Sequence, residues 1–375
     1  MNRLCESSHG NLEAVINITG YKGEPQRKLI HFSRDGVTGQ WSDCAVVSHR
    51  PKFGGSIIQN ISPHRPDQRH GDLEVVVLED DGILRHYTRD SAIPANKGMH
   101  AWRLSAKINE PEDTQSPVLG MLLFRPQHIP PGDFSTLAID AAPIFQTQIP
   151  EGTNSDGTTL ETLVLDSKGK MTHYRCPQLG LRDNSTDAKH QWIKKSTIPT
   201  GEVSITGPAY LFQKDDTLMA LISHTNCINV WYFGSNNKWN RGISQPLQPG
   251  ISCVYSEMIQ GSSIDFALSC RDAELHVEAI PHLNQKNGEK SPLPYSLTKI
   301  RNTPHHRVLA TNPISIISRA NNAPGRSQKI DAIAFHACGA GWRDTWMILH
   351  WSRDVGANEW VVSDVVLPHV TGMPL

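Results

Sequence analysis

The sequence lacks an excess of charge of either sign. Its 375 residues include 36 lysines and arginines and 37 aspartates and glutamates, which gives a formal net charge of −1. Such a chain has no broad basic face for nucleic acid or anionic lipid, so we expect neither partner. Apolar runs of the roughly 20 residues that span a bilayer are also missing, and we expect no membrane span. Residues 1–10 contain no apolar signal-peptide segment, which favours a cytoplasmic location.

Cysteine pairs with CxxC spacing are missing as well. The seven cysteines are scattered, and an odd number without a pattern predicts reduced, mostly buried thiols rather than a disulfide framework. Glycosylation sequons, which matter only in a secreted chain, begin at Asn17, Asn60 and Asn184.

Short catalytic motifs are also absent. The sequence has no GxSxG, no phosphate-binding loop and no GxGxxG that opens a helix, which excludes the common hydrolase, kinase and dehydrogenase classes. Histidines in loop-like sequence lack HExxH or Cys-His spacing; they are His64, His70, His305 and His306. We therefore expect no metal site and no cofactor.

Helix-forming windows are equally scarce. The 25 prolines and 28 glycines are spread so evenly that few stretches suit a helix. What is present is a series of short β-branched or apolar runs, such as 75–78, 162–165 and 361–362, near turn pairs such as Asp81-Gly82. The sequence predicts an all-β chain.

One phrase recurs along these strands: Leu-Glu, an apolar strand, a turn, His-aromatic, Arg-Asp and then Trp. The clearest copies occupy residues 12–41, 73–102 and 160–192, and the last copy ends at Trp360. Self-similarity at a period of roughly 40–60 residues is typical of propellers and solenoids, because one unit cannot bury its own apolar face. A further strand precedes most copies, which makes four strands per unit, as in the blade of a β-propeller.

We predict one β-propeller domain over residues 1–375, with six four-stranded blades. The expected blades span approximately residues 1–49, 51–108, 141–199, 205–247, 251–300 and 308–365. Because Leu12 lies so near the start, we expect the tail at 365–370 to supply the missing strand of the first blade and close the ring. Residues 109–140 form either an insertion or a remnant blade, so a seven-bladed ring stays open.

The repeated side chains have a structural and a functional interpretation. The repeated histidines are 31, 86, 173, 276 and 350, and the closing tryptophans are 41, 102, 192, 239 and 360. We interpret them as packing residues, with each His bonded to a neighbouring blade, rather than as a ring of imidazoles or as sugar-stacking platforms. The Arg-Asp pairs at 34–35, 89–90 and 353–354 either stabilise turns or form a charged rim.

The repeat is broken most clearly in its last copy. Residues 336–346, HACGAGWRDTW, insert a glycine-rich hairpin that carries acid, cation and indole side chains. We name His336, Arg343 and Asp344 as candidates for proton transfer and oxyanion stabilisation. Trp342 and Trp346 are the candidate wall on which a substrate stacks. An ordinary long hairpin is the alternative interpretation.

The repeat resembles that of known propellers. Residues 71–90, GDLEVVVLEDDGILRHYTRD, followed by Trp102, resemble the repeat of β-propeller lectins related to the Photorhabdus and fungal fucose-binding lectins. The chain is also similar to lectin-like propellers of fungal biosynthetic clusters, among them intermolecular hetero-Diels–Alderases of tropolonic sesquiterpenoid pathways. The likeness covers most of the chain, but it concerns blade-building residues, so no site residue is carried over.

This second resemblance implies a reaction of meroterpenoid secondary metabolism. A tropolone or phenol loses water to give an o-quinone methide, which is joined to a terpene alkene such as humulene without a cofactor. The partners implied are therefore small hydrophobic molecules.

Two functions compete. A multivalent lectin repeats its sugar contacts from blade to blade, whereas here the loops differ in length and chemistry and one blade lacks its Trp. That divergence favours one asymmetric site, and hence an enzyme or a protein that binds a single ligand; we commit to the enzyme. A glycan-binding lectin of the fucose type is the alternative, and a scaffold for protein partners is a third class. The exact substrate and the oligomeric state do not follow from the sequence.

Overall fold

Strands dominate the part of the chain that the structure, a computed structural model, describes. The described residues are 4–19, 24–60, 71–89, 102–108, 143–148, 158–165, 170–177, 191–199, 205, 209–214, 217–224, 227–246, 259–261, 264–271, 274–280, 298–300, 306–308, 315–319, 329–338, 346–354 and 360–370. Every regular element in these ranges is a β-strand, which confirms the predicted all-β class. Within them, no helix has the length and apolar character to cross a membrane.

The first three sheets are four-stranded and antiparallel. Sheet 1 contains β1 (Leu4–Glu6), β2 (Leu12–Thr19), β3 (Arg27–Arg34) and β4 (Trp41–Ser48). Sheet 2 contains β5 (Pro51–Gln59), β6 (Leu73–Glu79), β7 (Leu84–Arg89) and β8 (Arg103–Lys107). Sheet 3 contains β9 (Ile144–Gln148), β10 (Thr158–Leu165), β11 (Met171–Pro177) and β12 (Ile193–Ile198).

The second half of the chain forms three more sheets. Sheet 4 contains β13 (Tyr210–Lys214), β14 (Thr217–Ser223), β15 (Cys227–Phe233) and β16 (Trp239–Pro246). Sheet 5 contains β17 (Ile259–Gly261), β18 (Ile264–Arg271), β19 (Glu274–Ile280) and β20 (Thr298–Ile300). Sheet 6 contains β21 (His306–Val308), β22 (Ser315–Arg319), β23 (Lys329–Cys338), β24 (Trp346–Asp354) and β25 (Val361–Val370), with β21 and β22 both paired to β23.

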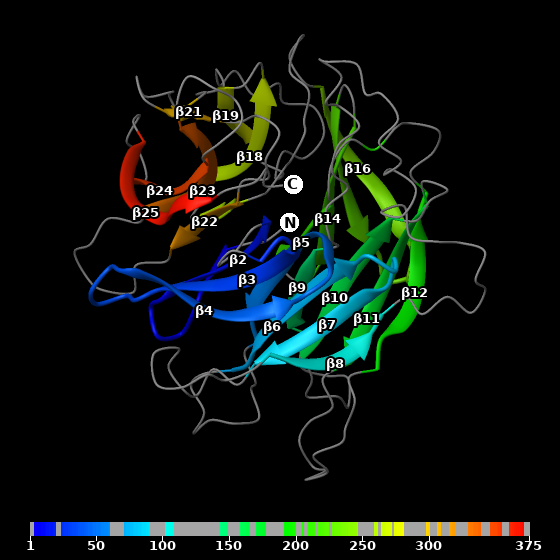
Figure 1. Cartoon of the computed structure of the whole chain (residues 1–375). Coiled ribbons are helices and arrows are strands. Elements are labelled where there is room, and N and C mark those ends of the chain that lie inside the picture. Colours follow the sequence, from blue (N-terminus) through cyan, green and yellow to red (C-terminus); the bar gives the residue numbers. More distant parts are fainter. Residues whose placement is uncertain are drawn as a thin grey trace, which may run out of the picture.

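The sheets follow one another around a common centre, and the first (blue) lies beside the last (red) (Figure 1). Apolar clusters fill the spaces between neighbouring sheets. They include Val15 with Val75 for sheets 1 and 2, Val76 with Leu160 for sheets 2 and 3, and Leu163 with Ala220 for sheets 3 and 4. Both faces of a sheet are therefore covered, which explains why β6 is buried at every position and why its centre, residues 75–78, is a continuous apolar run.

Sheets 1 and 6 close the ring, but not in the way that we predicted. Ile16 and Phe32 of sheet 1 share an apolar cluster with Ile333 and Ile348 of sheet 6. The first sheet has its own inner strand, because β1 pairs with β2. The C-terminal tail instead continues β25, the outer strand of sheet 6, which pairs with β24. The expectation that residues 365–370 complete the first blade was wrong, and packing between sheets closes the ring.

The repeated His-aromatic step has a backbone signature. The register between the third and fourth strands shifts at this step in four sheets, at His31/Phe32, His86/Tyr87, His173/Tyr174 and His350/Trp351. A bulge of this kind bends the outer strand and increases its twist. The predicted hairpin at Asp81-Gly82 is also present, with Gly82 at a φ of 79°. The insertion or remnant blade at 109–140 lies outside the described residues, so the number of blades stays a prediction.

Candidate functional site

Each well-described copy of the repeat contains a buried carboxylate bonded to the repeated histidine of the same sheet. The carboxylate comes from the second strand, at the Glu of the Leu-Glu phrase or at Asp331, and the His comes from the third strand. The pairs, with their Nε2-to-oxygen distances, are Glu13–His31 (2.9 Å), Glu74–His86 (2.7 Å), Glu161–His173 (2.7 Å) and Asp331–His350 (2.7 Å). We call these the carboxylate–histidine pairs. We had predicted that each His forms a hydrogen bond to a neighbouring blade. The bonds from Nε2 are instead made to a carboxylate of the same sheet.

The closing tryptophan of the next sheet packs edge-on against each of these imidazoles. The ring contacts, with centroid distances, are His31–Trp102 (5.4 Å), His86–Trp192 (5.5 Å), His173–Trp239 (5.4 Å) and, across the ring closure, His350–Trp41 (5.7 Å). Edge-to-face pairs of this kind contribute roughly 0.5–1.5 kcal/mol beyond the area that they bury. The interpretation of these His and Trp residues as packing residues is confirmed.

In sheet 1, the histidine of the Glu13–His31 pair has a second polar partner, which comes from sheet 2. Arg89 Nη1 of sheet 2 lies 2.7 Å from His31 Nδ1. Because a guanidinium only donates, Nδ1 accepts and the proton of a neutral His31 is on Nε2, where it is donated to Glu13. Burial raises the pKa of Glu13, but the hydrogen bonds from His31 and Ser33 and the nearby Arg89 charge outweigh it and hold the pKa below its usual value.

Burial decides what these groups do chemically. The side chains of His31, His86 and His173 have 0% exposure. Desolvation lowers the pKa of His86 to about 3, so this imidazole is neutral at physiological pH. The enclosed His86 imidazole, with its Nε2 proton donated to Glu74, has no route to a substrate. The other three imidazoles are equally enclosed and bonded to carboxylates, so we interpret the pairs as structural.

Sheets 4 and 5 depart from the pattern. By register, Met219 and Val230 occupy the carboxylate and His positions in sheet 4, and Asp265 and Glu278 occupy them in sheet 5. The prediction that His276 is one of the repeated histidines was wrong. With Asp265 at the carboxylate position, the matching His position is Glu278, whereas His276 pairs with Ser269, two residues earlier.

The Arg-Asp pairs do not act as units. Arg89 and Arg353 are both about 95% buried. Arg89 bonds to His31, and the guanidinium of Arg353 lies 5.2 Å from the ring centre of Trp360. Asp35 instead accepts the backbone N–H groups of Val37 and Thr38 and shapes the β3–β4 turn. Arg89 and Arg353 thus belong to the core, whereas Asp35 stabilises a turn, as one of the two predicted interpretations had it.

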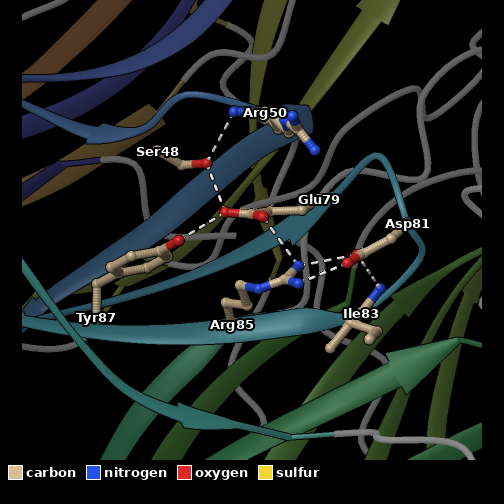
Figure 2. A network of polar contacts seen from close by, with 7 residues as sticks. All are labelled: Ser48, Arg50, Glu79, Asp81, Ile83, Arg85 and Tyr87. Carbon is tan, nitrogen blue, oxygen red and sulfur yellow. Dashed lines mark hydrogen bonds and ion pairs between the residues drawn. The ribbon is translucent and has the colours of Figure 1, made fainter.

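A separate polar network occupies the hairpin between β6 and β7 (Figure 2). Glu79 accepts hydrogen bonds from Ser48 Oγ and Tyr87 Oη, each at 2.6 Å, and forms an ion pair with Arg85 at 2.9 Å. Arg85 also donates to Asp81 at 2.8 Å. Burial, together with the Glu79 carboxylate, raises the pKa of Tyr87. The network ties the end of β4 to this hairpin and is a structural clamp.

The predicted site residues are only partly placed. His336 lies near the end of β23 opposite Met347, and Trp346 begins β24 opposite Ala337. Trp342, Arg343 and Asp344, and the side chains of His336 and Trp346, lie outside what the structure describes.

The remaining expectations concern thiols, sequons and metals. Cys5, Cys44, Cys176 and Cys227 are free thiols, as predicted, and burial raises the pKa of Cys176 to about 12. The sequon residues Asn17 and Asn60 are buried. Among the described residues, no group of three or more His, Cys, Asp or Glu side chains is placed to hold a metal ion.

Comparison with known proteins establishes the fold. No protein-family model matches the chain, and a search of curated proteins finds no match. Among solved structures, a mutant of the Aleuria aurantia lectin in complex with α-methyl-L-fucoside has 15% sequence identity and a TM-score of 0.56, covering 99% of this chain and 96% of the lectin. A triple mutant of AofleA from Arthrobotrys oligospora has 9% identity and a TM-score of 0.52, covering 96% and 87%. The chain has the β-propeller fold of these structures.

Sequence reasoning missed the partners of the repeated histidines. The Leu-Glu phrase was recognised only as a marker, although an acid at one fixed place in an otherwise buried strand signals a buried ion pair or hydrogen bond. Arg175 was missed as well. It lies directly opposite Glu161, a relation that depends on strand register and not on spacing along the chain.

Proposed function

We propose that this lectin-like propeller is a cofactor-independent hetero-Diels–Alderase with one asymmetric active site. The observation that supports the proposal is the enclosure of the repeated polar side chains. His31, His86 and His173 have no exposed surface and are bonded to carboxylates. Imidazoles and carboxylates that are bonded to each other and enclosed are not available to bind a sugar at the same position of every blade. We therefore assign ligand binding to the segments that differ between the repeats.

The proposed reaction has two steps. A hydroxymethyl tropolone or phenol loses its hydroxyl group and the ring O–H proton as water, which leaves an o-quinone methide. The oxygen and the exocyclic carbon of this heterodiene then form one C–O and one C–C bond to an alkene of a terpene such as humulene. The first step needs a proton at the leaving hydroxyl and a donor at the ring oxygen. The second needs an apolar cavity that holds both partners in reacting geometry.

The hairpin at 336–346 is the proposed site. Asp344 and His336 are the proposed proton donors, Arg343 the donor to the ring oxygen, and Trp342 and Trp346 the stacking wall. These roles rest on the residue types and on their absence from the other repeats.

The test is conversion of a hydroxymethyl tropolone and humulene by the purified protein. The expected result is an adduct of defined stereochemistry in excess of a heat-denatured control. Asp344→Asn and Arg343→Gln should each lower kcat by roughly 10²–10⁴-fold, the usual contribution of a positioned acid or donor. Arg103→Gln, which changes an exposed arginine on β8, should leave kcat unchanged. If product does not exceed that of the denatured control, the proposal fails.

A fucose-type lectin is the second candidate function. It is favoured by the match over nearly the whole chain to the Aleuria aurantia lectin in complex with α-methyl-L-fucoside. On this alternative, the chain binds a glycan between neighbouring sheets and forms no product. Sugar binding in the absence of conversion distinguishes it from the enzyme.

A further inference from the structure

Arg175 breaks the repeat at a position defined by register. The residue directly opposite the buried carboxylate is a small hydroxyl residue in three sheets: Ser33 in sheet 1, Thr88 in sheet 2 and Ser352 in sheet 6. In sheet 3 the residue opposite Glu161 is Arg175. Among the four carboxylate–histidine pairs, sheet 3 is thus the one with a guanidinium directly opposite the carboxylate, at its junction with sheet 4.

The Arg175 guanidinium is held on one side and open on the other. Its Nε donates to Glu161 Oε1 at 2.7 Å, and its Cζ lies 5.7 Å from the ring centre of Phe233 in sheet 4. Glu161 is also bonded to His173, so the carboxylate is fixed. Within the described residues, the terminal nitrogens Nη1 and Nη2 have no hydrogen-bond partner, and the side chain is 22% exposed. Glu161 therefore engages one of the guanidinium's donors, and Nη1 and Nη2 bond to none of the described residues.

Apolar residues flank the Arg175 guanidinium at this junction. Ile193, which pairs with Arg175 across β11 and β12, is 41% exposed, and Phe233 is half-buried. Phe233 occupies the place that Arg89 has at the junction of sheets 1 and 2, where the guanidinium instead bonds to His31.

We propose that Arg175, Phe233 and Ile193 form a binding site for the carboxylate of a ligand with a flat apolar body. The two terminal nitrogens of a guanidinium form a fork that matches the two oxygens of a carboxylate. Its anchoring by Glu161 fixes the fork before binding, which lowers the entropic cost of association. Phe233 and Ile193 provide the apolar contact for the body of the ligand. This site is independent of the reaction proposed for residues 336–346.

The experiment is a calorimetric titration with benzoate, using benzyl alcohol as the neutral probe of similar shape. Benzoate should bind with a stoichiometry of one, and benzyl alcohol should not bind. Arg175→Ser introduces the residue that sheets 1 and 6 carry at this position, and it should weaken benzoate binding by about tenfold or more, because two charge-assisted hydrogen bonds are lost. Arg175→Lys keeps the charge and loses the fork, so it should also bind more weakly.

Two further variants separate binding from folding. Phe233→Leu leaves the Arg175–Glu161 pair in place and should weaken benzoate more than acetate. Arg103→Gln removes an exposed arginine elsewhere and should change neither. Equal benzoate affinity in Arg175→Ser and the unaltered protein would overturn the proposal, as would absence of benzoate binding in the unaltered protein. If Arg175→Ser fails to fold, the Phe233→Leu and Arg175→Lys results decide.

Discussion

The carboxylate–histidine pairs stabilise the propeller, because each His is bonded within its own sheet and packs against a Trp of the next sheet. Sheet 4 shows which residues replace such a pair. Met219 and Val230 occupy the same two positions there, so an apolar pair fills the place of a buried polar one. Replacing a buried polar pair by packed apolar residues is often nearly neutral, whereas removing one partner leaves an uncompensated group.

A prediction follows for sheet 2. His86→Val alone leaves Glu74 buried without its imidazole partner, and we expect it to lower the free energy of unfolding by about 3–5 kcal/mol. The double variant Glu74→Met/His86→Val copies the pair of sheet 4 and should recover most of that loss. Urea denaturation of both variants provides the measurement. A double variant no more stable than the single one would show that the pair is not interchangeable with packing.

The same pair predicts a pH dependence. The pKa of His86 is about 3 in the folded protein and near 6.5 in the unfolded chain, so the unfolded chain binds more protons between these values. This contribution to stability is present above pH 6.5 and is lost as the pH falls toward 3, at up to about 1.4 kcal/mol per pH unit. Glu74→Met/His86→Val should unfold with a shallower pH dependence in that window. An unchanged slope would mean that His86 does not carry the effect.

At the scale of elements, alternation and turn pairs were sufficient to predict strands and hairpins. The inner strand of sheet 1 was missed because β1 has only three residues, Leu4–Glu6, too few to show a pattern. The tail was misplaced because an apolar run such as 365–370 looks the same whether it starts a new sheet or extends β25. Cross-strand relations such as Glu161 with Arg175 could not be predicted, because they depend on bulges and hairpin lengths.

The clamp on the β6–β7 hairpin yields a prediction at this scale. Tyr87→Phe removes one of the donors to the buried Glu79 carboxylate, so we expect a loss of roughly 1–2 kcal/mol in the free energy of unfolding. Tyr232→Phe is the matched control, because Tyr232 is 40% exposed. Chemical denaturation should show a shift for the first and almost none for the second. Equal shifts would mean that the clamp does not contribute to stability.

For the whole molecule, the first and last sheets must pack together for the ring to close. Leu4 of β1 and Ile348 of β24 lie far apart in sequence and share one apolar cluster. Leu4→Ala and Ile348→Ala should each cost about 2–5 kcal/mol, as for other buried aliphatic residues. Both should lower the same cooperative thermal transition, whereas Val361→Ala, at a position 63% exposed, should leave it nearly unchanged. Two separate transitions, each affected by one variant, would contradict closure of the ring by these sheets.

The most direct test of whether the repeat is structural or sugar-binding is a calorimetric titration of the purified chain with α-methyl-L-fucoside. Because the imidazoles of the carboxylate–histidine pairs are enclosed and bonded, we predict no repeated binding and no heat that corresponds to several sugars per chain. Saturable binding of several fucosides per chain would contradict this account and would assign the repeated positions to glycan recognition.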